Sequence, residues 1–180
     1  SISVNISGLH LIVGTVLADL DAALQGRHFP AERMQIELTE SFLLGDPELA
    51  IKRLNELRDR GPGIVIDDFG TGFTSLSYVK RLPIDKLKID MTFVKDLPNS
   101  ADDAAIAMTI VSLAQGLNLR VVGEGVQTQA QHDFLRDLGC HFAQGYLYSR
   151  PVTADRMTRF LAQRLAESEE QAGHWPNVSS

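Results

Sequence analysis

Residues 63–76 read GIVIDDFGTGFTSL, in which a short apolar run ends in two adjacent aspartates, Asp67 and Asp68, and a glycine-spaced polar loop follows at once. A short apolar run bounded by turn residues is typical of a strand that is buried in a sheet. Two carboxylates side by side repel each other, so the end of such a strand is a costly place for both. The stretch therefore predicts a buried strand whose carboxyl end carries charges that need a counterpart.

Five more runs with strand-like composition lie before and after this one, at residues 2–7, 34–40, 86–90, 120–126 and 141–147. Helical patterns separate most of them. Residues 47–61 and 101–118 place apolar side chains on one face of a helix, and Thr128 with Gln131 forms a capping box that opens a third helix. Thr153 can cap a last helix. Strands that alternate with helices predict a parallel sheet in which every strand ends at the same face.

The polarity of two strands distinguishes a barrel from a doubly wound sheet. Polar and apolar residues alternate in both, and the polar set consists of Ser3, Asn5, Ser7, Gln35, Glu37 and Thr39. Helices on both faces of a flat sheet would bury that set at a cost of a few kcal/mol for each unpaired group. At the mouth of a barrel the same side chains meet water and ligands. We therefore predict an α/β fold, a modified (β/α)8 TIM-type barrel.

The number of strands makes this expected barrel incomplete. A closed barrel of this type needs about eight strands, and the sequence predicts about six, so the missing strands are expected before Ser1. We expect one domain over residues 1–165 that lacks its N-terminal strands. A disordered tail is expected over residues 166–180, where the helical periodicity is lost.

Composition narrows the class of protein. The chain has 180 residues with 44% hydrophobic content, which suits a soluble globular domain with a core of its own. A net charge of −6 without a block of lysine and arginine argues against binding to polymeric nucleic acid. Cys140 is the single cysteine, and no run of about 18 apolar residues is present, so we expect a cytoplasmic setting without membrane contact.

Polar residues recur at the end of one predicted strand after another: Asn5, Glu37, Asp67, Asp68, Lys88, Glu124 and Gln144. Acidic side chains gathered at one rim repel each other unless a cation lies between them. Oxygen ligands without histidine or cysteine suit Mg²⁺ or Mn²⁺. Two such ions roughly 3.5 to 4 Å apart cleave phosphodiesters by in-line displacement. The pattern favours this chemistry.

Each of these residues also has an ordinary interpretation. Two adjacent aspartates often form a solvated turn or a helix cap, and Glu37 alone could be a surface residue of an edge strand. Lys88 could form a local ion pair with Asp90, and Gln144 could belong to a turn. The repetition of polar groups at the same end of successive strands favours a shared site over these alternatives.

The chain closely resembles the EAL family of cyclic di-GMP phosphodiesterases. The resemblance covers about residues 2–160 and rests on five motifs in order: SVNIS (3–7), IELTES (36–41), DDFGTGFTSLSYVKRLPIDKLKID (67–90), VVGEGVQT (121–128) and GCHFAQGYLYSRP (139–151). It implies a modified (β/α)8 barrel that hydrolyses cyclic di-GMP to the linear dinucleotide pGpG with two Mg²⁺ or Mn²⁺ ions. It also implies a homodimer and, in a longer protein, upstream sensor or GGDEF-type domains.

The resemblance assigns roles by position. The metal ligands it implies are Asn5, Glu37, Asp67, Asp68 and Glu124, and the catalytic residues are Lys88, Glu124 and Asp68. The residues it places beside the substrate are Gln127, Gln144 and Tyr146. Glu40 matches a glutamate that steadies the DDFGTG loop, a loop tied in this family to dimer contacts and regulation.

The sequence departs from the family pattern in three places. Gln127 replaces a glutamate, and Phe73 and Thr74 replace a tyrosine and a serine. The Glu-Ala-Leu stretch itself is absent, and with it a metal-binding glutamate and a substrate-binding arginine. We therefore expect weak or no turnover from these 180 residues. The alternatives are a module that binds cyclic di-GMP without cleaving it and a dimerising structural fragment.

Overall fold

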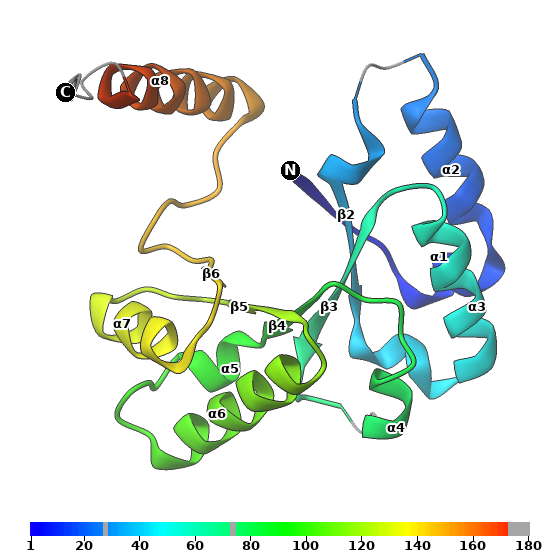
Figure 1. Cartoon of the computed structure of the whole chain (residues 1–180), viewed down its shortest axis with the longest axis horizontal. Coiled ribbons are helices and arrows are strands. Elements are labelled where there is room, and N and C mark those ends of the chain that lie inside the picture. Colours follow the sequence, from blue (N-terminus) through cyan, green and yellow to red (C-terminus); the bar gives the residue numbers. More distant parts are fainter. Residues whose placement is uncertain (27–28, 73–74, 173–180) are drawn as a thin grey trace, which may run out of the picture. The chain divides into compact units, whose positions relative to one another are not determined.

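The computed structural model describes residues 1–26, 29–72 and 75–172, and it divides into two units, Ser1–Leu147 and Tyr148–Ser180. The first unit contains one sheet of six parallel strands: β1 (Ile2–Asn5), β2 (Met34–Thr39), β3 (Gly63–Phe69), β4 (Lys86–Ile89), β5 (Arg120–Gly123) and β6 (Phe142–Ala143). Neighbours in the sheet are neighbours in the sequence, from β1 to β6 (Figure 1). A doubly wound sheet would reverse this order at a switch point, so the predicted incomplete barrel is confirmed.

Helices and 3-10 turns connect the strands, and they are α1 (Gly8–Val13), α2 (Thr15–Leu24), η1 (Ala31–Arg33), η2 (Glu40–Leu44), α3 (Pro47–Arg58), α4 (Leu76–Val79), α5 (Met91–Val94), α6 (Ala101–Gly116) and α7 (Gln129–Leu138). The helices α3, α6 and α7 lie where the sequence predicts them. The capping box of Thr128 and Gln131 opens α7 as expected. The helices α1 and α2, which together join β1 to β2, were not predicted from the sequence.

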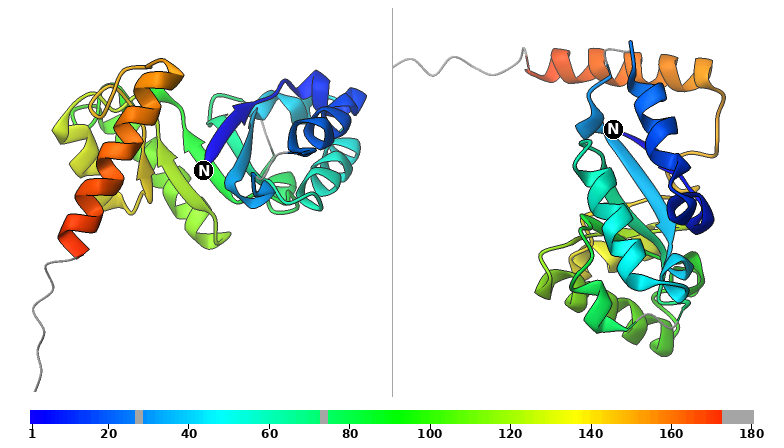
Figure 2. Two further views of the ribbon diagram at one scale, coloured as in Figure 1. Left: turned by 90° about the horizontal axis from the view of Figure 1, so that it is seen from above. Right: turned by 90° about the vertical axis from the view of Figure 1, so that its right-hand side faces the viewer.

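The core lies between the sheet and its helices. Strand side chains such as Ile64, Ile66 and Leu87 are fully buried. They pack in one core with Leu54 of α3 and Ile110 of α6. Figure 2 shows these helices along the outer face of the curled sheet. Because side chains alternate along a strand, the neighbouring polar residues face the opposite side, which is the interior of the half-barrel.

Five of the predicted strands end earlier than expected, and the shortening is greatest in two of them. The expected strands over 120–126 and 141–147 end at Gly123 and Ala143, and the residues beyond form loops. Gly125 explains one ending, since its backbone has a positive φ of 66°. The loops remain joined through the backbone, because Val126 N donates to Gln144 O at 3.0 Å. The polar residues predicted on these strand ends therefore lie on loops.

The second unit contains α8 (Ala154–Ala172). Thr153 directly precedes it, and the carbonyl of Thr153 accepts a hydrogen bond from Met157 N at 3.0 Å. The helix runs through residue 165, and the predicted domain boundary there stays a prediction. Residues 173–180 of the predicted tail lie outside the described residues. Among the helices that the structure describes, none is long and apolar enough to cross a membrane.

Candidate metal centre at the carboxyl ends of the strands

Lys88 joins three strands at the interior of the half-barrel. Its side chain extends from β4 and is only 4% exposed. Its Nζ lies 2.8 Å from Glu37 Oε2 of β2, 3.1 Å from Asp67 Oδ1 of β3 and 2.6 Å from Glu124 Oε1 after β5. The structure thus brings together four of the residues that the sequence placed at strand ends. Among the described residues, Lys88 and Asp90 do not form an ion pair with each other, so the alternative of a local pair is not supported.

A bulge at the end of β3 explains how two adjacent aspartates face the same site. Ile66 pairs with Leu87 and Phe69 pairs with Ile89, so β3 has one more residue than β4 between these positions. Asp68 takes up the extra length with a φ of +52°, a left-handed conformation that is uncommon outside glycine. Its backbone N–H donates to Asp67 Oδ1 at 3.0 Å. A regular strand would send the two side chains to opposite faces.

The donor set fits a divalent cation. Asp67, Asp68 and Glu124 each offer a carboxylate oxygen, and these oxygens lie within 4.8 Å of one another. With Glu37 the group has four carboxylates and one lysine, a net charge of −3 when all are ionised. Carboxylate oxygens are the ligands that hard cations such as Mg²⁺, Mn²⁺ and Ca²⁺ prefer. This cluster can therefore bind a divalent metal ion.

Electrostatics at the cluster shift several pKa values. Burial raises the pKa of Glu124 to about 7. The hydrogen bond with Lys88 acts in the opposite direction, and the charge of Asp67 raises the pKa further. Burial alone would lower the pKa of Lys88, but hydrogen bonds to Glu124 and Glu37 outweigh it and raise that pKa above its ordinary value. The lysine therefore stays charged, and Glu124 exchanges a proton near neutral pH.

Asp90 lies beside this cluster, although from the sequence it was expected only as a partner of Lys88. It caps α5 by accepting a hydrogen bond from Thr92 N at 2.7 Å. Burial and then a hydrogen bond to Asp90 raise the pKa of Asp68. The pKa of Asp90 is lowered, because hydrogen bonds from Thr92 outweigh its burial. The sequence contained a sign of this position, because Asp90 directly follows β4 just as Asp67 and Asp68 lie at the end of β3.

Asn5 is the last residue of β1, and its Cα is paired in register with Glu37. The side chain of Asn5 is exposed, whereas Glu37 is buried. The register places the amide on the same rim as the carboxylates, next to the strand that carries Glu37. Its predicted role as a metal ligand stays a prediction.

Glu40 holds the start of the polar loop that follows β3. Its carboxylate is buried, and Oε2 accepts hydrogen bonds from Gly70 N at 3.1 Å and from Gly72 N at 3.3 Å. A Cβ on Gly72 would lie 3.0 Å from Glu40 Cδ, so a larger residue would push the carboxylate away. This geometry is that of a loop-stabilising residue. Phe73 and Thr74, the two departures in this loop, lie outside the described residues.

The predicted substrate-side residues lie on two loops that pack backbone to backbone. A Cβ on Gly145 would lie 2.1 Å from Val126 O, so only glycine permits this contact. Gln144 and Tyr146 flank Gly145, and both side chains are exposed. Gln127 is also exposed, and its backbone N–H donates to the capping residue Gln131 at 2.8 Å. All three are therefore accessible beside the loop that carries Glu124.

A model of the EAL domain family matches residues 1–151, which is most of the chain. The chain belongs to the EAL domain family. The bifunctional diguanylate cyclase/cyclic di-GMP phosphodiesterase MucR of Pseudomonas aeruginosa is 41% identical over 162 residues, covering 90% of this chain and 24% of MucR. The cyclic di-GMP phosphodiesterase NbdA of the same organism is 40% identical over 160 residues, covering 89% of this chain and 20% of NbdA. The chain thus spans about a quarter or less of these curated relatives.

Solved EAL structures have the same fold. The MucR phosphodiesterase in complex with c-di-GMP has a TM-score of 0.83 and 42% sequence identity, and the alignment covers 87% of this chain and 64% of that chain. BlrP1 of Klebsiella pneumoniae, solved with manganese and cyclic di-GMP, has a TM-score of 0.71 and 32% identity, covering 83% of this chain and 38% of that chain. Both likenesses are close enough in sequence to support the family as well as the fold.

Proposed function

We propose that this EAL domain hydrolyses cyclic di-GMP to the linear dinucleotide pGpG with divalent metal ions, Mg²⁺ or Mn²⁺, at the carboxyl ends of the strands. The observation that carries the proposal is the convergence of Glu37, Asp67 and Glu124 on Lys88 from three strands. The names of MucR and NbdA and the cyclic di-GMP in the related structures support the choice of substrate.

The proposed metal ligands are Asn5, Glu37, Asp67, Asp68 and Glu124. A pair of bound ions would supply an activated water and stabilise the leaving oxygen of the phosphodiester. Asp67 and Asp68 are suited to hold neighbouring ions because the bulge turns both carboxylates to one site. Asp90 lies next to Asp68 and raises the pKa of that ligand, after the larger effect of burial.

Lys88 and Glu124 are the proposed proton-handling and charge-balancing pair. The ammonium of Lys88 remains protonated and lies at the centre of the carboxylates, where it can neutralise a phosphate oxygen and orient the attacking water. In the absence of bound metal, the carboxyl group of Glu124, with a pKa of about 7, can accept a proton and release it near neutral pH. Both groups are held in place by the same hydrogen bond of 2.6 Å.

Gln127, Gln144 and Tyr146 are proposed to contact the dinucleotide. All are exposed on the loops after β5 and β6, next to the cluster. An amide at position 127 donates and accepts hydrogen bonds without the repulsion that a carboxylate exerts on phosphate. We also propose a cytoplasmic homodimer in which Glu40 and its loop transmit regulation. Sensor or GGDEF-type domains upstream are proposed as well, and the diguanylate cyclase activity in the name of MucR supports a second catalytic domain in such proteins.

Metal binding tests the site directly. We expect Mn²⁺ to bind the chain in isothermal titration calorimetry, and Asp67→Asn to weaken that binding by roughly tenfold or more, because it removes a ligand charge next to three other acids. Asp96→Asn is the matched control, since Asp96 is exposed after α5 and is not one of the clustered carboxylates. Equal Mn²⁺ affinity in wild type and Asp67→Asn would contradict the site.

Product analysis separates hydrolysis from capture. We expect slow accumulation of pGpG when the chain is incubated with cyclic di-GMP and Mn²⁺, and a loss of roughly 100-fold or more in Asp67→Asn. The Asp96→Asn control is expected to match wild type. Bound but uncleaved cyclic di-GMP in the wild-type chain would support the alternative, a binding module.

A further inference from the structure

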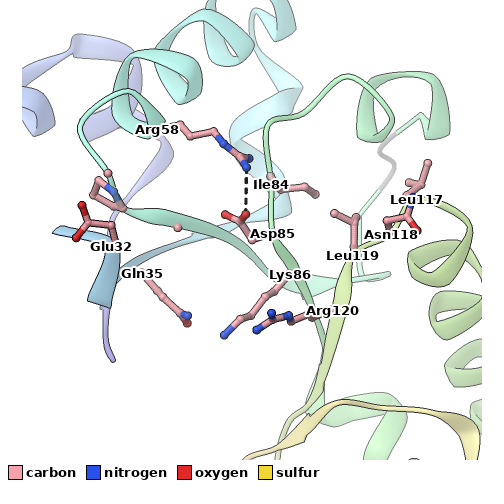
Figure 3. Close-up of a pocket in the computed structure, with 13 residues that line it drawn as sticks. Glu32, Gln35, Arg58, Ile84, Asp85, Lys86, Leu117, Asn118, Leu119 and Arg120 are labelled. Atoms are coloured by element: carbon pink, nitrogen blue, oxygen red, sulfur yellow. Dashed lines mark hydrogen bonds and ion pairs between the residues drawn. The ribbon is translucent and has the colours of Figure 1, made fainter. Parts of the chain in front are cut away.

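A pocket lies at the end of the strands opposite the metal cluster, where the chain enters the sheet (Figure 3). Its volume is about 630 Å³. Its walls come from the first residues of β2, β3, β4 and β5 and from the loops before them, including Gln35, Gly63, Lys86 and Arg120. This volume is in the range of small-molecule sites. The metal cluster uses none of these residues.

Two cations stand side by side in this pocket. Lys86 and Arg120 are the first residues of β4 and β5, and their Cα atoms are register partners. Like charges directly opposite each other on neighbouring strands are destabilising. Figure 3 shows both head groups and the amide of Gln35 turned toward the same space. Burial, and after it the charge of Arg120, lower the pKa of Lys86.

The charges of Asp85 and Glu37 partly offset the repulsion at Lys86, but among the described residues neither Lys86 nor Arg120 forms an ion pair with an acid that lines the pocket. Asp85 Oδ1 lies 3.3 Å from Arg58 Nη2, and Asp85 Oδ2 accepts the backbone N–H of Ile64 at 2.8 Å. Glu32, the other acid of the lining, points away from both head groups (Figure 3). Within the part of the chain that the structure describes, Arg120 forms no ion pair, and the ammonium of Lys86 meets the ring of Phe142 at 4.6 Å.

The donors in the pocket match an oxyanion. Arg120 presents a planar fork, Lys86 a point charge, and Gln35 an amide whose Oε1 already accepts the hydroxyl of Ser3 at 3.5 Å, which leaves its NH₂ group to donate. A tetrahedral phosphate can accept from three directions at once, whereas a carboxylate offers two oxygens in one plane. We propose that the pocket at the amino ends of the strands binds a small phosphate-bearing anion through Lys86, Arg120 and Gln35.

Binding of inorganic phosphate tests this proposal independently of the metal site. The titration uses the whole chain with EDTA at constant ionic strength, so that no divalent cation contributes. We expect phosphate to bind wild type and Asp67→Asn alike, and Arg120→Gln and Lys86→Gln each to weaken binding by roughly tenfold. Arg136→Gln is the matched control, because Arg136 pairs with Asp133 and Asp137 on the surface of α7. Undiminished binding in Arg120→Gln would overturn the site.

The melting temperature of a charge-reversal variant gives a second test, because the variant is expected to be stable without phosphate and not to respond to it. Arg120→Glu places a carboxylate opposite Lys86, so we expect its melting temperature without phosphate to be equal to or above that of wild type. Phosphate should raise the melting temperature of wild type and leave that of Arg120→Glu unchanged. Acetate at the same ionic strength should have no effect on either. A wild type that responds equally to acetate and phosphate, or to neither, would overturn the assignment to phosphate.

Discussion

Lys88 and Lys86 lie two residues apart on β4 and face the same side of the sheet, yet their surroundings are opposite. At the carboxyl end, Lys88 contacts three carboxylates, and these hydrogen bonds raise its pKa despite burial. At the amino end, Lys86 is paired in register with Arg120, and burial, followed by the charge of Arg120, lowers its pKa. The interior of the half-barrel is therefore acidic at one rim and cationic at the other, and each rim suits a ligand of the opposite charge.

Removing Lys88 should have the largest effect on stability. Lys88→Met leaves Glu37, Asp67 and Glu124 without their shared cation in a buried site, and breaking a buried ion pair in this way costs about 3–5 kcal/mol. We expect that loss in the free energy of urea unfolding at about pH 8 in EDTA. Added Mn²⁺ should restore part of it, because the cation binds the same carboxylates. A loss below about 1 kcal/mol would contradict the central role of Lys88.

The pH dependence of stability should reflect Glu124. Its pKa in the folded chain is about 7, above the ordinary 4.5, so the folded state holds a proton that the unfolded state has already lost between these values. Stability contributed by the protonated group is full below about pH 4.5 and is lost as pH rises to about 7, on the order of 2 to 3 kcal/mol. Glu124→Gln should flatten this slope in urea unfolding measured in EDTA. A slope unchanged by the substitution would show that other groups cause it.

Glu40 should affect the loop more than the fold. Glu40→Gln removes the charge from the two hydrogen bonds to Gly70 and Gly72, an expected loss of about 1–2 kcal/mol. The amides of Gly70 and Gly72 should then exchange with deuterium faster, while amides of β2 remain protected. Faster exchange across the whole sheet would indicate general destabilisation and not a local role in the loop.

Lys86→Met is the counterpart of Lys88→Met and should have the smallest effect. The methionine loses the cation–π contact with Phe142, which is worth about 0.5–1 kcal/mol at an exposed site, but it also removes the repulsion from Arg120. The two effects offset each other, so we expect a change within about 0.5 kcal/mol in phosphate-free buffer. The same substitution at two positions of one strand thus gives opposite outcomes. Equal losses from both would remove the contrast between the two rims.

Much of this fold and site could be predicted from the sequence. Alternating polarity in residues 2–7 and 34–40 predicted a barrel interior, and the strand order of the structure confirms it. The recurrence of polar residues at strand ends predicted the convergence of Glu37, Asp67, Lys88 and Glu124. Both are local periodic patterns, which sequence displays directly.

The remaining features depend on three-dimensional register. The bulge that lets Asp67 and Asp68 share a site arises from the pairing of β3 with β4, and no single strand contains that information. The early ends of β5 and β6 follow from backbone contacts between their loops, as at Gly145 and Val126. The pairing of Lys86 with Arg120 brings together residues 34 positions apart in the sequence, and only the sheet reveals it.

Anomalous scattering from Mn²⁺ soaked into crystals of this chain tests the central claim most directly. We predict an anomalous peak at the carboxyl rim, roughly 2.0–2.3 Å from carboxylate oxygens of Asp67, Asp68 or Glu124. A Mn²⁺ peak elsewhere in the molecule with none at this rim, or no peak at millimolar Mn²⁺ with these side chains well ordered, would contradict it.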